Sequence, residues 1–157
     1  MMKIICILLT LCVSLSCGLL DPRGSSRIDT PTDQIIMFTD IDDLSLKLDA
    51  AAIDSAAVVA DSLILFVAYG GGCKIHQFLL YGSSAILKSN PPQAEIYLSH
   101  DADNDLCEAY IHERLSFDLQ PLKRSYQKQF SNNGPLLLRL VPPGVDAPYM
   151  PMPVYAF

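Results

Sequence analysis

Short apolar runs separated by polar turn residues dominate the chain from residue 32 onward. Runs rich in Val, Ile, Leu, Tyr and Phe, bounded by Gly, Pro, Asn, Asp and Ser, are typical of β-strands. The segment 63–69 is apolar on both faces, which indicates a central strand, and it is expected to form a hairpin with 56–60. The full set of predicted strands is 35–38, 56–60, 63–69, 74–81, 94–100, 108–117 and 136–141.

One helix interrupts the strand pattern. It is predicted to begin after the capping residue Asp118 and to stop at Asn133 and Gly134. Its apolar positions share one face, as a helix of 3.6 residues per turn requires: Leu119, Leu122, Tyr126 and Phe130. The segment 42–57 fits either a helix or a strand. The balance predicts a mainly β domain, an antiparallel β-sandwich or partly open barrel with one crossover helix.

The C-terminal tail is rich in proline from Pro142 onward. Proline removes a backbone donor, so most of this tail cannot pair within the centre of a sheet. We expect it to run along the domain in an extended, polyproline-like conformation.

The first 16 residues have the layout of a secretory signal peptide. One early cation, Lys3, precedes a short apolar run from Ile4 to Val13, and small residues follow up to Cys17. A membrane span needs roughly 20 apolar residues, so this run predicts a leader that is removed after export. Export places the mature chain outside the cytoplasm.

The end of the leader, Ser14-Leu15-Ser16-Cys17, resembles the lipobox of bacterial lipoproteins. The resemblance covers the leader alone, and the rest of the chain is similar to an uncharacterised exported module. It implies that the sulfur of Cys17 carries a covalent lipid and that the protein is an anchored lipoprotein of the bacterial cell envelope. The alternative is an ordinary secreted protein cut close to this position.

This interpretation divides the chain into a signal peptide (1–16), a lipidated cysteine with a flexible tether (17–31) and one β-rich domain with its proline-rich tail (32–157). The tether is polar, rich in turn residues and without periodicity. No acidic run follows Cys17 that would favour one side of the envelope. The periplasmic and surface faces therefore both stay open.

The charge balance narrows the range of partners. The chain has 11 Lys and Arg against 17 Asp and Glu, a formal net charge of −6. Nucleic acid is an unsuitable partner, because phosphate binding needs a cationic surface and the chain has no Lys/Arg cluster. Anionic headgroups are disfavoured for the same reason, so attachment to the membrane would depend on lipid. A protein or small-ligand partner stays open.

The cysteines predict a disulfide. Of five cysteines, Cys6 and Cys12 leave with the leader and Cys17 would carry lipid, which leaves Cys73 and Cys107. An even pair in an exported domain is first of all a disulfide, because the compartment is oxidising.

Polar side chains are expected to gather around this disulfide at one end of the sheet. If 74–81, 94–100 and 108–117 are successive antiparallel neighbours, both cysteines, His76 and His100 lie at the same end. Alternation along the strands places His100 on the face of Ala94, Ile96 and Leu98, and His76 on the face of Phe78 and Leu80. The simplest interpretation makes both histidines ordinary strand-end residues, hydrogen-bonded to loop backbone.

A metal site is the alternative interpretation of this end. Two thiolates and two imidazoles would suit zinc or copper, and His76 and His100 with an aspartate would form a site without the cysteines. The aspartates of the adjoining loop are Asp101, Asp103 and Asp105. They match the first ligands of a calcium loop, but Leu106 replaces the required glycine and His112 the final glutamate, which favours an exposed acidic turn.

Catalytic signatures are scarce. The sequence has no GxSxG, HExxH, P-loop or GxGxxG motif, and no catalytic residue is predicted. A nucleophilic Cys73 beside His76 would need a free thiol, which an oxidising compartment disfavours. The sequence therefore predicts an envelope lipoprotein with a structural or binding role, no cofactor and no assigned enzymatic activity. A metal-binding envelope lipoprotein is the alternative.

Overall fold

The structure is a computed structural model, and it describes residues 33–131, 133–145, 148–149 and 151–157. The predicted signal peptide, the predicted lipidation site Cys17 and the predicted tether lie outside the described residues. Within the described part, no helix is long and apolar enough to cross a membrane.

The described chain is mostly strand, as the sequence predicts. In chain order the elements are β1 (Asp33–Gln34), β2 (Ile36–Phe38), the 3-10 helix η1 (Ile41–Asp43), β3 (Ala51–Val59), β4 (Ser62–Gly71), β5 (Gln77–Ser83), β6 (Gln93–Asp101), β7 (Ala109–Asp118), α1 (Gln120–Gln129), β8 (Leu136–Val141) and β9 (Val154–Tyr155). The ambiguous segment 42–57 resolves into the end of η1, an irregular stretch and most of β3.

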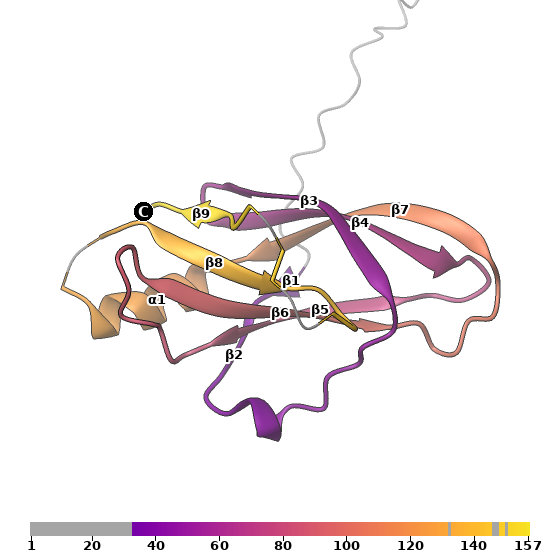
Figure 1. The fold of residues 1–157 in the computed structure, drawn as a ribbon, viewed down its shortest axis with the longest axis horizontal. Helices are drawn as coiled ribbons and strands as arrows, with labels where there is room; N and C mark the ends of the chain where they lie inside the picture. Colours follow the sequence, from indigo (N-terminus) through magenta and orange to yellow (C-terminus); the bar gives the residue numbers. More distant parts are fainter. Residues whose placement is uncertain (1–32, 132, 146–147, 150) are drawn as a thin grey trace, which may run out of the picture.

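The strands form two sheets, with the orders β1-β7-β4-β3 and β2-β5-β6-β8-β9 (Figure 1). Buried side chains from both sheets make a single apolar core, so the predicted sandwich is confirmed. Both sheets are mixed, however, because β1 with β7, β2 with β5 and β6 with β8 run parallel. The predicted β3–β4 hairpin is antiparallel, and the helix lies between β7 and β8 as expected.

One predicted neighbour relation is wrong. β7 does not lie beside β6 but in the other sheet, where it pairs with β4 over ten residue pairs from Ser62↔Asp118 to Gly71↔Ala109. The strand β4 is apolar from Leu63 to Tyr69, and it is central, because it pairs with β7 on one side and with β3 on the other. Chain order alone does not distinguish a neighbour in the same sheet from a strand that crosses to the facing sheet.

The end of the C-terminal tail packs into the core, whereas the sequence predicted an extended segment along the domain surface. Tyr155 in β9 is fully buried, and its hydroxyl donates to Asp61 Oδ1 at 2.7 Å. Phe157 packs against the rings of Tyr126 and Tyr155. The residues after the prolines therefore close the core at the α1 end.

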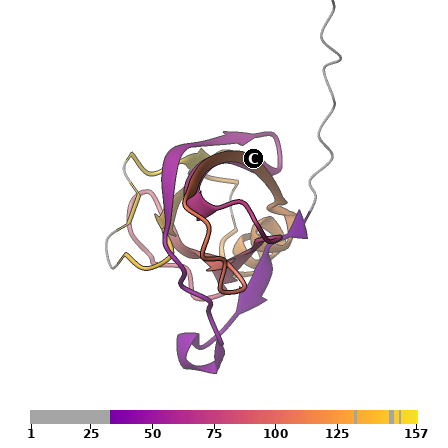
Figure 2. The same ribbon diagram turned by 90° about the vertical axis from the view of Figure 1, so that its right-hand side faces the viewer.

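The two ends of the molecule differ in character. The helix α1 follows Asp118, which pairs with Ser62 at one end of the β4–β7 ladder, and it lies at one end of the molecule in Figure 1. The β4–β5 and β6–β7 connections lie at the opposite end, which faces the viewer in Figure 2. This second end carries the cysteines and histidines that the sequence singled out.

Candidate functional site

The two cysteines form the predicted disulfide. Cys73 lies just after β4 and Cys107 just before β7, with a Cα–Cα distance of 5.9 Å. The last pair of the β4–β7 ladder is Gly71↔Ala109, so Cys73 and Cys107 are each two residues further along the same antiparallel register. The β4–β7 ladder therefore brings the cysteines together, whereas the sequence predicted that successive pairing of 74–81, 94–100 and 108–117 would do so. We call residues 72–76 and 101–108, which this bond joins, the stapled end.

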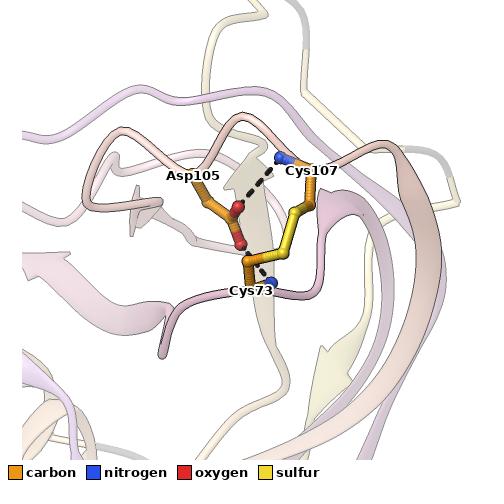
Figure 3. A group of neighbouring side chains, drawn as sticks. All are labelled: Cys73, Asp105 and Cys107. Carbon is orange, nitrogen blue, oxygen red and sulfur yellow. Dashed lines mark hydrogen bonds between the residues drawn. A yellow bond between two sulfur atoms is a disulfide. The ribbon is translucent and has the colours of Figure 1, made fainter.

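Asp105 accepts hydrogen bonds from both segments of the stapled end. Its Oδ2 accepts the backbone N–H groups of Gly72, Cys73 and Lys74, each at 2.9 Å, and its Oδ1 accepts the N–H of Cys107 at 2.9 Å. Figure 3 shows the carboxylate beside the disulfide, between the two segments that it joins. These donors, with that of Cys107 contributing most, hold the pKa of Asp105 well below its usual range.

The burial of Asp105 corrects the expectation of an exposed acidic turn. Its side chain is only 1% exposed. Asp103 does lie at the surface, where it pairs with Lys74 at 3.5 Å, and Asp101 pairs with Lys47 at 3.8 Å. The three aspartates therefore have three different partners.

The two histidines contact each other directly. His76 Nδ1 lies 2.9 Å from His100 Nε2, and His76 Nε2 lies 3.3 Å from Asp105 Oδ2. The other ring nitrogen of His100, Nδ1, lies 3.0 Å from the carbonyl oxygen of Asp49. The His76 side chain is 2% exposed and His100 is 1% exposed. The predicted bond from His100 to loop backbone is present, but His76 bonds to side chains.

Aromatic rings enclose the histidine pair. His100 stacks on Phe78 with a centroid distance of 4.3 Å and an interplanar angle of 3°. The Tyr69 ring lies against both imidazoles, and its hydroxyl donates to Glu113 at 2.7 Å. Burial, followed by the bond to Glu113, raises the pKa of Tyr69 to about 12. Because these groups are buried, the arrangement suits a structural or proton-holding role better than catalysis on an external substrate.

Two glycines make this packing sterically feasible. A Cβ at Gly71 would lie 2.5 Å from His76 Nε2, and the φ angle there is +152°. Gly72 also has a positive φ, +114°. Glycine at these positions therefore lets the backbone adopt a positive φ and approach the imidazole of His76.

Metal binding at this end stays a prediction. The sulfurs of Cys73 and Cys107 are bonded to each other, and the ring nitrogens of His76 and His100 are in hydrogen-bond contacts. Among the described residues, only Cys73, Asp105 and Cys107 bring three potential ligand atoms within 4.8 Å of one another, and this set includes the two bonded sulfurs.

Two aliphatic side chains protrude from the stapled end. Ile75 is 93% exposed and Leu106 is 92% exposed, and each is the neighbour of a residue that Asp105 or the disulfide holds. Sequence reasoning missed both. The available signal was an aliphatic residue inside a polar connection, next to Lys74 in one case and Cys107 in the other.

Comparison with known proteins shows a shared fold and assigns no activity. No model of a known protein family matches the chain, and no curated protein matches it in sequence. Solved bacterial structures share the fold. A NigD-like immunity protein from Bacteroides caccae has a TM-score of 0.52 at 18% identity, with 68% of this chain and 52% of that one covered.

Two further structures are similar to the same extent. A candidate lipoprotein from Bacteroides fragilis has a TM-score of 0.52 at 12% identity, covering 68% of this chain and 60% of that one. A candidate toxin-related protein from Parabacteroides distasonis has a TM-score of 0.54 at 16% identity, covering 79% and 60%. The chain thus matches between half and three-fifths of the length of these structures, and the likeness establishes a shared fold.

Proposed function

We propose that this protein is a lipid-anchored protein of the bacterial cell envelope whose stapled end binds another protein. The observation that carries the binding role is the exposure of Ile75 and Leu106 on two segments that Asp105 and the disulfide immobilise. Burying one such side chain contributes roughly 1.5 to 3 kcal/mol. Side chains on a rigid backbone lose less conformational entropy on binding, so more of this energy is available as affinity.

The charges around these two residues indicate the chemistry of the partner. Asp103 and Glu108 are exposed on the same segment as Leu106, and Asp101 is partly exposed. Lys74 pairs with Asp103 and Lys47 with Asp101, so these three acidic and two basic side chains leave a small negative balance. The complementary surface is an apolar recess with cationic side chains at its rim. An anionic membrane would repel the same acidic groups, which argues against insertion of Ile75 and Leu106 into lipid.

The position of the anchor also favours a protein partner. The described chain begins at Asp33 in β1, which pairs with Phe117 near the α1 end of β7. The stapled end lies at the other end of β7, roughly 30 Å away for a strand of this length. A lipid on Cys17 would attach the domain from the α1 side, and the predicted tether 17–31 is long enough to let the stapled end face away from the membrane.

The structural neighbours support both parts of the proposal. One of them is described as a candidate lipoprotein, in agreement with the lipobox-like Ser14–Cys17, and another as an immunity protein. The shared fold is compatible with a binding role. Anchoring and binding are separable, and they have separate tests.

The anchor is tested by Cys17→Ala in a bacterial host that incorporates labelled fatty acid. We expect the wild-type chain to carry label and to sediment with membranes, and the variant to lose both properties. A variant that stays labelled and membrane-bound would contradict lipidation at Cys17.

Binding is tested by a photo-crosslinking amino acid introduced in living cells at position 75, 106 or 59. Val59 is the matched control, because it is also aliphatic and 63% exposed but lies at the α1 end of β3. Positions 75 and 106 should give one discrete protein adduct of the same mass, and position 59 should not. Lipid adducts at 75 and 106, or the same adducts at all three positions, would refute the proposal.

A further inference from the structure

The hydrogen-bond contacts of His76 and His100 determine how many protons the pair carries. Each end of the pair faces an atom that can only accept a hydrogen bond. At one end, His100 Nδ1 is 3.0 Å from the carbonyl oxygen of Asp49, so this nitrogen must carry a hydrogen. The main chain fixes this geometry, because His100 and the 47–49 segment exchange backbone hydrogen bonds on both sides.

At the other end, His76 Nε2 faces the carboxylate of Asp105 at 3.3 Å. Four backbone N–H groups donate to this carboxylate and keep it ionised, so it has no proton to offer. His76 Nε2 must therefore carry a hydrogen as well.

The two remaining nitrogens, His76 Nδ1 and His100 Nε2, are 2.9 Å apart. If both rings were neutral, each would have used its single hydrogen at its outer end, and two lone pairs would face each other across this distance. A nitrogen–nitrogen contact of this length instead requires a hydrogen between the two atoms. Three hydrogens on four ring nitrogens give the pair one positive charge.

We infer that His76 and His100 form a buried proton-binding site, in which the pair holds one shared proton compensated by the Asp105 carboxylate. The inference follows from this chain's own contacts and does not depend on the proposed binding partner. The pair then joins three segments that are distant in the sequence: the residues before β3, the β4–β5 connection and the β6–β7 connection.

Burial indicates where the proton resides. Desolvation is the main cause that lowers the pKa of His100, and the neighbouring His76 lowers it further. His76 is the ring in contact with Asp105. The charge is therefore placed on His76, and His100 accepts from it as a neutral ring.

The surroundings are acidic and aromatic, which suits a cation. Phe78 and Tyr69 present their rings to the pair. The charged and titratable groups that face it or line the recesses beside it are Asp105, Lys74, Asp49, Tyr69, Glu113, Asp33 and Arg114. The cations among these groups are Lys74 and Arg114, and the ammonium of Lys74 contacts Asp103 rather than the histidine pair.

Loss of the shared proton would weaken the packing of the stapled end. The nitrogen–nitrogen contact would become repulsive, and the buried Asp105 would lose its cationic partner. The disulfide and the backbone N–H donors to Asp105 would still hold the segments that present Ile75 and Leu106. The site therefore couples the stability of this end to pH.

The direct test is nuclear magnetic resonance of the folded domain with 15N-labelled histidine, at neutral pH and with a chelator present. The spectrum distinguishes ring nitrogens that carry hydrogen from those that do not, and the exposed His112 serves as a reference. We expect three hydrogen-bearing nitrogens and one bare nitrogen in the pair. Two bare nitrogens, or none, would overturn the inference.

A second test uses proton linkage. On this inference the folded pair holds its shared proton at a pH where unfolded histidines are mostly neutral, above about pH 7, so the folded state binds more protons and stability falls as pH rises. His76→Gln replaces the charged donor with a neutral one, and it should remove this fall from the melting temperature. Tyr69 has a pKa of about 12, so its ionisation lies above the pH range of this measurement. Identical alkaline profiles for wild type and variant would contradict the inference, and the spectroscopic test stands if the variant does not fold.

Discussion

Cys73 and Cys107 lie opposite each other on the continuation of the β4–β7 ladder, two residues beyond its last pair. The disulfide thus closes an antiparallel pair at the point where its hydrogen bonds end. Asp105 binds the backbone of the same two segments, so one covalent bond and four hydrogen bonds hold the stapled end.

Removal of the disulfide should destabilise the domain substantially. The bond joins residues 34 apart, and in the chain-entropy model a loop of this length contributes about 3 to 4 kcal/mol. The double variant Cys73→Ser/Cys107→Ser should therefore show a loss of this size in denaturant unfolding. Wild type measured under reducing conditions is the control and should lose a similar amount. A loss below about 1 kcal/mol in both would show that the bond is not a main source of stability.

Gly71 and Gly70 provide a matched pair of substitutions. Alanine at Gly71 would place a Cβ 2.5 Å from the imidazole of His76 at a positive φ, whereas nothing lies within 4 Å of a Cβ at Gly70. Gly71→Ala should lower the free energy of unfolding by about 1 to 3 kcal/mol, and Gly70→Ala should change it by less than about 1 kcal/mol. Equal effects in thermal unfolding would mean that the contact between Gly71 and His76 is not close.

Asp105 should give the domain a distinctive acid sensitivity. Its pKa is lowered in the folded state, so its contribution to stability is present above the unfolded value of about 4 and is lost as pH falls below that value. Asp105→Asn should flatten the dependence of the melting temperature on pH in this acid range. Asp103→Asn is the control, because Asp103 is exposed on the same connection. An unchanged acid profile in Asp105→Asn would contradict the role given to the four N–H donors.

The oxidised domain should not need a metal for its stability. Its cysteines are joined, and its buried histidines and Asp105 have hydrogen-bond partners. We expect metal analysis of the purified domain to find far less than one equivalent of zinc or copper, and chelators to leave the melting temperature unchanged. Two free thiols with one bound equivalent, and unfolding by chelator, would support the metal-binding alternative.

Much of the fold follows from local pattern. Alternation of apolar residues predicts the strands, and it places His100 on the buried face that also carries Ala94, Ile96 and Leu98. Compartment and cysteine count predict the disulfide. These inferences succeed because each depends on neighbours in sequence or on the chemistry of a single residue type.

The errors concern long-range pairing and burial. The partner of β7 depends on which sheet it joins, and the sequence pattern is the same for either choice. The alternating aspartates resemble an exposed turn, yet Asp105 is buried because backbone N–H groups from a distant connection converge on it. The sequence predicts that His76 and His100 lie at the same end, and the β5–β6 pairing places them there. It does not predict their direct hydrogen-bond contact or the contact of His76 with Asp105.

The affinity of the stapled end for its crosslinked partner tests the central claim most directly. The dissociation constant should be measured for wild type, for Ile75→Ser/Leu106→Ser and for Val59→Ser, with each mature domain shown to be folded. Loss of two buried aliphatic side chains should weaken binding by more than about a hundredfold, and Val59→Ser should leave it unchanged. Equal dissociation constants for all three proteins would show that Ile75 and Leu106 do not form the binding surface.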